Sequence, residues 1–123
     1  MQFTTINEPA NDEPFYIVEG VGEKQITTDK KALWRILFNL EVDPSTINQE
    51  NIYVVDENGN KMDTTLKLSN TDGRHIIVLP PHEGYSYEEV YKLIVKNVKS
   101  KKGKILDREG EMLFLIKDEN SPL

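Results

Sequence analysis

The sequence predicts an all-β fold, a β-sandwich of about seven short antiparallel strands, rather than a parallel α/β fold. Apolar and polar residues alternate over several short segments, most clearly over 33–40 and 111–117. Such alternation is typical of strands with one buried face. Proline and Asx-Gly turns separate the segments at near-regular spacing, as in antiparallel sandwiches.

The first half of the chain provides four expected strands. Phe15 to Val18 is a short apolar run, and Lys24 to Thr28 is a second, weaker strand. The third strand, Leu33 to Leu40, places Trp34, Ile36 and Phe38 on one face. A single helical turn follows, with Asp43 as its cap and Pro44 at the first position, where a missing N–H costs nothing. Asn51 to Asp56 is the fourth strand.

The turn at Asn58-Gly59 allows two registers. A two-residue loop pairs Val55 with Met62, whereas a three-residue loop with Gly59 left-handed pairs Val54 with Met62. The second register also pairs Ile52 with Thr64. It collects five apolar residues on one face: Ile52, Val54, Met62, Leu66 and Leu68. We therefore favour the three-residue loop, provided that the two strands are neighbours.

The second half of the chain repeats this pattern. Asp72-Gly73 predicts a hairpin turn into a strand over 74–79, which Pro80-Pro81 ends. The last strand, 111–117, alternates between an apolar inward set and an outward set that includes Leu113 and Leu115. The segment from Ser86 to Val98 is ambiguous, because Ser86 and Glu89 form a capping box. Its many β-branched residues favour a strand from about Val90.

Length and composition indicate one soluble globular domain. We expect a polar lead-in or linker over 1–14, the domain over 15–118 and a tail over 119–123. Apolar residues make up 37% of the chain and charged residues 29%. No apolar run approaches the roughly 18 residues of a membrane helix. The first fourteen residues lack the basic start and apolar centre of a signal peptide.

Cysteine content and net charge exclude several classes of function. The chain has no cysteine, which excludes disulfides, thiolate zinc sites and a cysteine nucleophile. Its net charge of −6 disfavours general nucleic-acid binding. We therefore expect no nucleic-acid partner and no insertion into a membrane.

Charge is nevertheless unevenly distributed. Five acids and no base lie between Glu8 and Glu23, and six lysines lie between Lys92 and Lys104. The lysines either protect a strand edge and loop from pairing or form a patch for an anionic polymer. The first interpretation is favoured, because no aromatic residues are interleaved with them. The residues of the second are Lys99, Lys101, Lys102 and Lys104.

The order of short motifs carries a family resemblance. The motifs include Trp34-x-Ile36-x-Phe38-Asn39, Val42-Asp43-Pro44-Ser45-Thr46-Ile47-Asn48, Asn58-Gly59-Asn60, Tyr91-Lys92-Leu93-Ile94-Val95 and Met112-x-Phe114-x-Ile116. Over about 24–117 the chain resembles the bacterial immunoglobulin-like domains of surface-layer proteins (the Big family). Glu88-Glu89, where the family commonly has a small turn, and Asp107-Arg108-Glu109 depart from the pattern, which affects loop shape.

The resemblance implies a seven-stranded Greek-key sandwich from an exported, cell-surface protein. Such domains serve as spacers or adhesive modules, and the family has no shared catalytic residues. We expect no enzyme activity and no cofactor, with neighbouring domains of the same polypeptide or other surface proteins as partners. The alternative is a binding module for anionic cell-wall polymer or polysaccharide through the lysine-rich region 92–104. Tyr91 is expected to form a tyrosine corner, a structural role.

Several potential sites are discounted. Asp56-x-Asn58-x-Asn60 begins like a calcium loop, but lysines occupy the positions that should be Gly and Glu. His75 and His82, the only histidines, are not expected to share a metal. The acids Asp107, Glu109 and Glu111 are expected to be solvated rather than a glycosidase pair. Trp34 is expected in the core rather than as a sugar platform.

One surface hypothesis remains. If the inward sets of the two last strands face the core, then Ile94, Leu113 and Leu115 point outward together. They form either a contact patch for an adjacent domain or partner, or a patch that an N-terminal segment with Phe15 and Ile17 covers. Changing Leu113 to Lys leaves the fold intact in the first case and destabilises it in the second.

Overall fold

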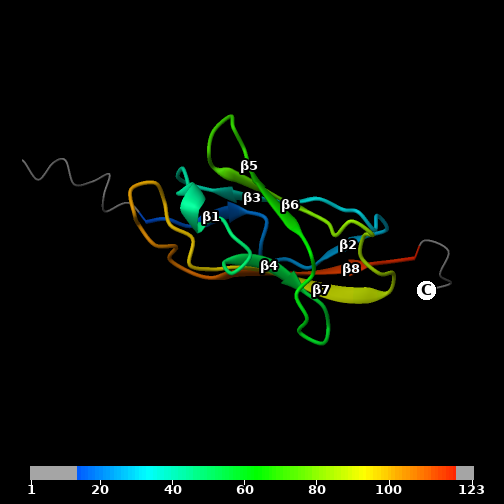
Figure 1. Ribbon diagram of the computed structural model, residues 1–123. Helices are drawn as coiled ribbons and strands as arrows, with labels where there is room; N and C mark the ends of the chain where they lie inside the picture. The colour runs from blue at the N-terminus through cyan, green and yellow to red at the C-terminus, as the bar shows by residue number, and fades with distance from the viewer. Residues whose placement is uncertain (1–13, 119–123) are drawn as a thin grey trace, which may run out of the picture.

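The computed structural model describes residues 14–118 and shows two packed sheets of four strands each (Figure 1). The predicted all-β sandwich is confirmed. One 3-10 helix, η1 (Pro44–Thr46), lies between the third and fourth strands. The strands are β1 (Ile17–Glu19), β2 (Gln25–Thr27), β3 (Trp34–Phe38), β4 (Ile52–Val55), β5 (Thr65–Leu68), β6 (His75–Leu79), β7 (Glu89–Val95) and β8 (Gly110–Ile116).

The strand order is that of a Greek-key sandwich. One sheet has the order β1-β3-β6-β5 and the other the order β2-β8-β7-β4. Apart from β2, these are the A-B-E-D and G-F-C sheets of an immunoglobulin constant-type sandwich. The remaining strand, β2, is additional to the seven strands of that sandwich. It pairs in parallel with β8, whereas the other strand pairs are antiparallel.

The predicted three-residue turn is confirmed, but the predicted strand pairing ends with it. Val55 bridges Lys61, the Met62 N–H donates to the Val54 carbonyl at 2.7 Å, and Gly59 has a φ of 85°. Beyond Met62 the expected pairing of β4 with β5 is wrong, because the chain crosses to the other sheet. β4 pairs with β7 and β5 with β6. The apolar face of β5 can be buried whether this strand pairs with β4 or with β6, so the apolar pattern alone did not distinguish the two pairings.

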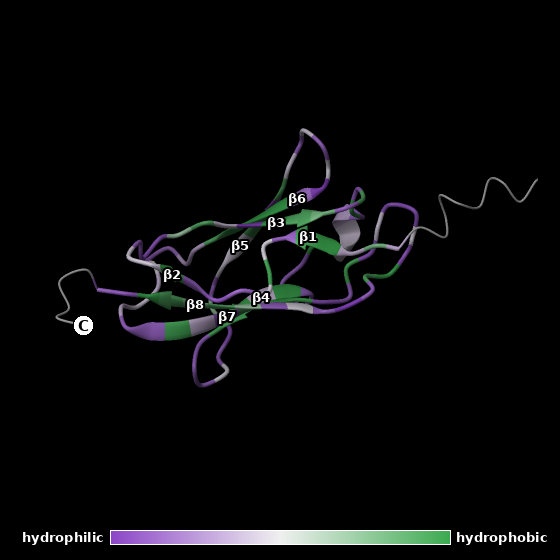
Figure 2. Ribbon diagram, turned by 180° about the vertical axis from the view of Figure 1, so that it is seen from behind, coloured by the Kyte–Doolittle hydropathy of each residue, from purple (hydrophilic) through white to green (hydrophobic). Residues whose placement is uncertain are grey.

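The core lies between the two sheets and is rich in aromatic residues. Phe114 is fully buried, with its ring centroid 4.9 Å from that of Trp34 and 5.4 Å from that of Tyr91. Phe15 and Phe38 stack at 5.4 Å. Trp34 is partly buried at the margin of the core, so it belongs to the core as expected. Apolar residues concentrate in the strands and polar residues in the connecting loops (Figure 2).

The ambiguous segment is a strand. β7 runs from Glu89 to Val95, and a turn rather than a helix precedes it. The Ser86 N–H donates to the hydroxyl oxygen of Tyr91 at 2.8 Å, so the predicted tyrosine corner is confirmed. Glu88 adopts a positive φ of 61°, and its carboxylate accepts a hydrogen bond from the Asp118 N–H at 2.7 Å.

The cap of η1 is also as predicted. The side chain of Asp43 accepts a hydrogen bond from the Ser45 N–H at 3.0 Å, and Pro44 occupies the first position. Hydrogen bonds to Ser45 hold the pKa of Asp43 below its ordinary value. The turn therefore fixes the path from β3 to β4.

The described chain enters and leaves the sandwich at opposite ends (Figure 1). At the first end, the Asn39 side chain donates to the Pro14 carbonyl and the Asp107 N–H to the Phe15 carbonyl. At the other end, the Lys117 N–H donates to the Thr27 carbonyl at 2.7 Å. The predicted lead-in (apart from Pro14) and tail lie outside the described residues, so the domain boundaries stay predictions.

Candidate functional site

The predicted partner surface lies on the outer face of the β2-β8-β7-β4 sheet. Leu113 is 40% exposed, and Ile94 and Leu115 are partly buried. The alternative, that Phe15 and Ile17 cover these residues, is wrong. Phe15 is fully buried in the core, and Ile17 begins β1, which belongs to the other sheet.

Sequence reasoning missed four further members of this outer face. The register places Ile26 beside Leu115, and Leu115 beside Val90. Tyr53 lies beside Ile94, and Val55 beside Lys92. The weak strand predicted over Lys24 to Thr28 includes Ile26, but no sequence signal showed which strand it would join.

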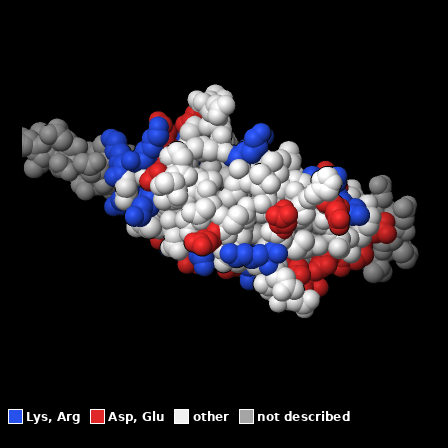
Figure 3. All heavy atoms as spheres, viewed as in Figure 1, with Lys and Arg blue, Asp and Glu red and all other residues white. Residues whose placement is uncertain are grey.

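The four lysines of the predicted polyanion contact lie in the β7–β8 connection at the end where the described chain enters. Basic side chains gather at this end (Figure 3). Lys99, Lys101 and Lys102 are exposed, and Lys104 is partly buried. The Nζ of Lys101 lies 3.3 Å from a carboxylate oxygen of Glu41. This arrangement offers exposed ammonium groups to an anion.

The calcium-like segment is a hydrogen-bonded turn. The Oδ1 of Asp56 accepts hydrogen bonds from the N–H groups of Asn58 and Asn60, both at 2.9 Å. The bond from the Asn60 N–H is the main reason that the pKa of Asp56 lies below its ordinary value. Within residues 14–118 no cluster of three acidic, histidine or cysteine side chains is arranged to hold a metal ion.

The other discounted groups lie apart from one another. The Nδ1 of His75 lies 2.8 Å from a carboxylate oxygen of Asp72, and this contact contributes to lowering the pKa of Asp72 after the larger effect of the Arg74 N–H. His82 is exposed in the β6–β7 connection. Asp107 and Glu109 are exposed before β8, whereas Glu111 pairs with Lys92 at 4.0 Å. None of these groups forms an acid–base pair with another across a cleft.

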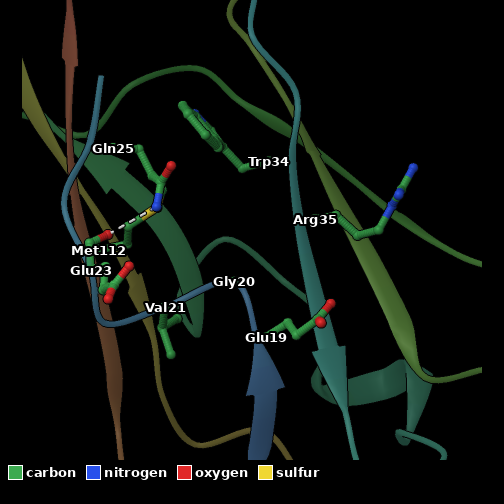
Figure 4. Close-up of a pocket in the computed structure, with 8 residues that line it drawn as sticks. All are labelled: Glu19, Gly20, Val21, Glu23, Gln25, Trp34, Arg35 and Met112. Carbon is green, nitrogen blue, oxygen red and sulfur yellow. Dashed lines mark hydrogen bonds between the residues drawn. The ribbon is translucent and has the colours of Figure 1, made fainter. Parts of the chain in front are cut away.

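A pocket of about 380 Å³ lies where the chain crosses from β1 to β2 (Figure 4). Its lining consists of Glu19, Gly20, Val21, Glu23, Gln25, Trp34, Arg35 and Met112. Figure 4 shows the Glu19 and Glu23 carboxylates on either side of the Gly20 backbone, with the Arg35 side chain directed away from Trp34. The lining contains no hydroxyl, thiol or imidazole group, and its ionisable groups are the carboxylates of Glu19 and Glu23 and the guanidinium of Arg35.

Two buried polar groups have no hydrogen-bond partner among residues 14–118. They are the Trp34 Nε1–H and the Tyr85 hydroxyl. Burial, with a smaller effect of neighbouring Tyr91, raises the pKa of Tyr85 above its ordinary value. Tyr85 therefore stays protonated and acts as an apolar filler beside Phe114, with ring centroids 5.1 Å apart.

Comparison with solved structures identifies the architecture. Over 88% of the chain, the structure matches 14% of the surface-layer protein rSbsC(31-844), with a TM-score of 0.62 and 16% identity. The chain has an immunoglobulin-like fold. It spans between about one seventh and one quarter of the surface-layer chains that it matches.

Two other solved structures have a similar fold. CopC from Methylosinus trichosporium OB3b matches 87% of this chain over 98% of its own length, with a TM-score of 0.64 and 18% identity. Part of Escherichia coli alpha-2-macroglobulin matches 87% of this chain over 33% of its own length, with a TM-score of 0.63 and 16% identity. At these identities the likeness concerns the fold alone.

No protein-family model and no curated protein matches the sequence. In residues 14–118 there is also no helix of the length and apolar character needed to cross a membrane.

Proposed function

We propose that this immunoglobulin-like domain is a non-enzymatic structural module of a bacterial cell-surface protein, where it acts as an in-line spacer. The observation that carries the proposal is that the described chain enters the sandwich at one end and leaves it at the opposite end (Figure 1). A domain that the chain enters at one end and leaves at the other extends a polypeptide by its own length. Its likeness to domains of surface-layer proteins supports a cell-surface setting.

The β1–β2 pocket is lined by no serine, threonine, cysteine or histidine, in keeping with a structural role. The two carboxylates of its lining lie on either side of the Gly20 backbone. Its aromatic residue, Trp34, packs on Phe114 in the core.

Antibodies raised against the purified chain test the cell-surface setting. We expect them to label intact cells of the producing bacterium and to lose that signal after the cells are treated with protease. Labelling only after lysis would contradict the proposal. An intracellular antigen of the same cells serves as the control for leakage.

A second candidate function is binding of an anionic wall polymer through Lys99, Lys101, Lys102 and Lys104. Their gathering at one end of the molecule favours it (Figure 3). The test is retention on purified cell wall at low and high salt, comparing the variant with both Lys101→Gln and Lys102→Gln to a control variant with both Lys30→Gln and Lys31→Gln. Salt-sensitive retention that only the first variant loses supports binding, whereas no retention leaves the spacer role alone.

A further inference from the structure

The outer face of the β2-β8-β7-β4 sheet is more continuously apolar than the outer face of the other sheet. We call it the lateral face and define it by Ile26, Tyr53, Val55, Val90, Lys92, Ile94, Glu111, Leu113 and Leu115. On β4, β7 and β8 these residues alternate with buried residues, so they share one side of the sheet. Ile26 of β2 belongs to the same side because it pairs with Leu115. Ile26, Leu115 and Val90 form an unbroken apolar row across three strands.

The opposite sheet provides an internal comparison. On its outer face, Ile77 lies between Arg35 and Lys67, and Leu37 lies between Glu19 and His75. Each of these apolar side chains thus has charged or polar neighbours on both adjacent strands. Apolar residues flanked by polar ones are typical of a sheet face that contacts water. In the row of Ile26, Leu115 and Val90, by contrast, no polar residue separates the apolar side chains.

Exposure confirms that the described chain leaves the lateral face open. Ile26 is 63% exposed and Leu113 is 40% exposed. Both strands that could have folded over it from the N-terminal side are placed elsewhere: β1 lies in the other sheet, and β2 forms part of the face itself. Contiguous exposed apolar patches of this kind mark interaction surfaces.

The charges on the lateral face indicate what it binds. Lys92 and Glu111 lie on adjacent strands with 4.0 Å between Nζ and Oε1, and their side chains are 41% and 59% exposed. An exposed pair of this kind contributes little to the stability of the domain. A partner surface of a single sign would repel one of the two charges. A second copy of the same face, related by a two-fold axis, can oppose each charge with its opposite.

We propose that two copies of this chain associate laterally through this face, with Lys92 of each copy opposite Glu111 of the other. The contact is isologous, so each residue pair occurs twice. At about 3.3 Å per residue, the seven-residue strands β7 and β8 are about 23 Å long and the shorter β2 and β4 about 10–13 Å. With strands about 4.8 Å apart, the face covers roughly 300 Å² per copy, below the area of a stable dimer. The association is therefore weak in dilute solution and gains from crowding at a surface. It goes beyond the spacer role, which holds or fails independently of it.

Sedimentation equilibrium of the full chain, up to about 1 mM, tests the proposal. We expect a reversible monomer–dimer equilibrium. Lys92→Glu alone and Glu111→Lys alone each place like charges opposite one another, so each raises the dimer dissociation constant by more than about tenfold. An equimolar mixture of the two variants forms a mixed dimer, because its two contacts are again of opposite sign.

Two further variants keep the result interpretable. Ile26→Lys tests the apolar row at an edge strand and is expected to abolish dimers without unfolding, as judged by the fluorescence of Trp34, the only tryptophan. Lys67→Glu, on the outer face of the opposite sheet, is the control and leaves the equilibrium unchanged. A wild-type chain that stays monomeric at every concentration would overturn the proposal. So would a mixture of the two charge variants that does not associate, or a Lys67→Glu variant that loses dimers equally.

Discussion

The backbone N–H of Ser86 donates a hydrogen bond to the hydroxyl oxygen of Tyr91, 2.8 Å away, and so ties the β6–β7 connection to the start of β7. Both Tyr91 and its neighbour Tyr85 are buried, with ring centroids 4.9 Å apart, but the hydroxyl of Tyr85 has no partner. The two tyrosines thus contact each other but differ in hydrogen bonding. The Tyr91 hydroxyl accepts a hydrogen bond, and the Tyr85 hydroxyl makes none with the described residues.

Replacing each tyrosine by phenylalanine is expected to have different effects. Tyr91→Phe removes the acceptor of the Ser86 N–H and lowers the free energy of unfolding by about 1 kcal/mol. Tyr85→Phe removes an unpaired buried hydroxyl, so the free energy of unfolding is unchanged or rises by up to about 1 kcal/mol. Urea unfolding followed by Trp34 fluorescence measures both. Equal destabilisation by the two changes would contradict this account.

Two glycines in the β1–β2 crossover form a matched pair. Gly20 and Gly22 have φ angles of +108° and +105°, but a Cβ on Gly20 would collide with the Arg35 carbonyl, whereas one on Gly22 would meet nothing. Gly22→Ala is expected to cost about 1–2 kcal/mol from backbone strain alone. Gly20→Ala adds the collision with β3 and costs clearly more. A similar thermal unfolding temperature for both variants would show that the crossover does not lie against β3.

Two leucines on adjacent strands test the inward and outward assignment. Leu93 of β7 is fully buried, and Leu113 of β8 is 40% exposed. Leu93→Ala is expected to lower the free energy of unfolding by about 2–5 kcal/mol, and Leu113→Ala by less than about 1 kcal/mol. Chemical denaturation at low protein concentration measures both without a contribution from dimers. Reversed magnitudes would mean that both β7 and β8 turn the opposite face to the core, whereas large losses from both changes would mean that β8 alone is shifted by one residue.

Acid is expected to destabilise the domain through its turn aspartates. Hydrogen bonds from backbone N–H groups hold the pKa values of Asp43, Asp56 and Asp72 below the ordinary 3.8. A carboxylate with a lowered folded-state pKa stabilises the fold above its unfolded-state pKa, and this contribution is lost as pH falls through the folded value. The free energy of unfolding therefore decreases below about pH 4.

Asp56→Asn separates the charge from the shape of the turn. The amide oxygen of Asn can still accept the bonds from Asn58 and Asn60, but it does not titrate. We expect this variant to be less stable than the wild type at neutral pH and to lose less stability on acidification. Urea denaturation at neutral pH and near pH 3 provides the comparison. An unchanged acid dependence would show that the Asp56 turn does not contribute to it.

Local patterns were enough to predict most of the fold. The alternation of Trp34, Ile36 and Phe38 depends on side-chain periodicity alone, and the left-handed Gly59 on the chemistry of its turn. The cap of Asp43 and the corner of Tyr91 also involve residues at most five positions apart. Interactions between residues so close in the sequence can be predicted from short motifs.

Pairings between distant segments could not be predicted. β2 and β8 are about ninety residues apart, and no turn connects them, so nothing in the sequence marked their parallel pairing. The chain between Met62 and Thr65 crosses between sheets, although the apolar face of β5 fits either sheet. For the same reason, the lateral face was recognised through Ile94, Leu113 and Leu115 but not through Ile26.

The distance between the two ends of the described domain tests the spacer account most directly. The sequence has no cysteine, so Tyr16→Cys together with Lys117→Cys provides two spin-label sites, whose separation pulsed electron paramagnetic resonance measures. Tyr16→Cys with Arg108→Cys is the control, because both residues line one pocket. We predict a separation of more than about 20 Å for the first pair, since β7 and β8 span that length, and a clearly shorter one for the control. Equal short distances would place both ends of the domain together and contradict an in-line module.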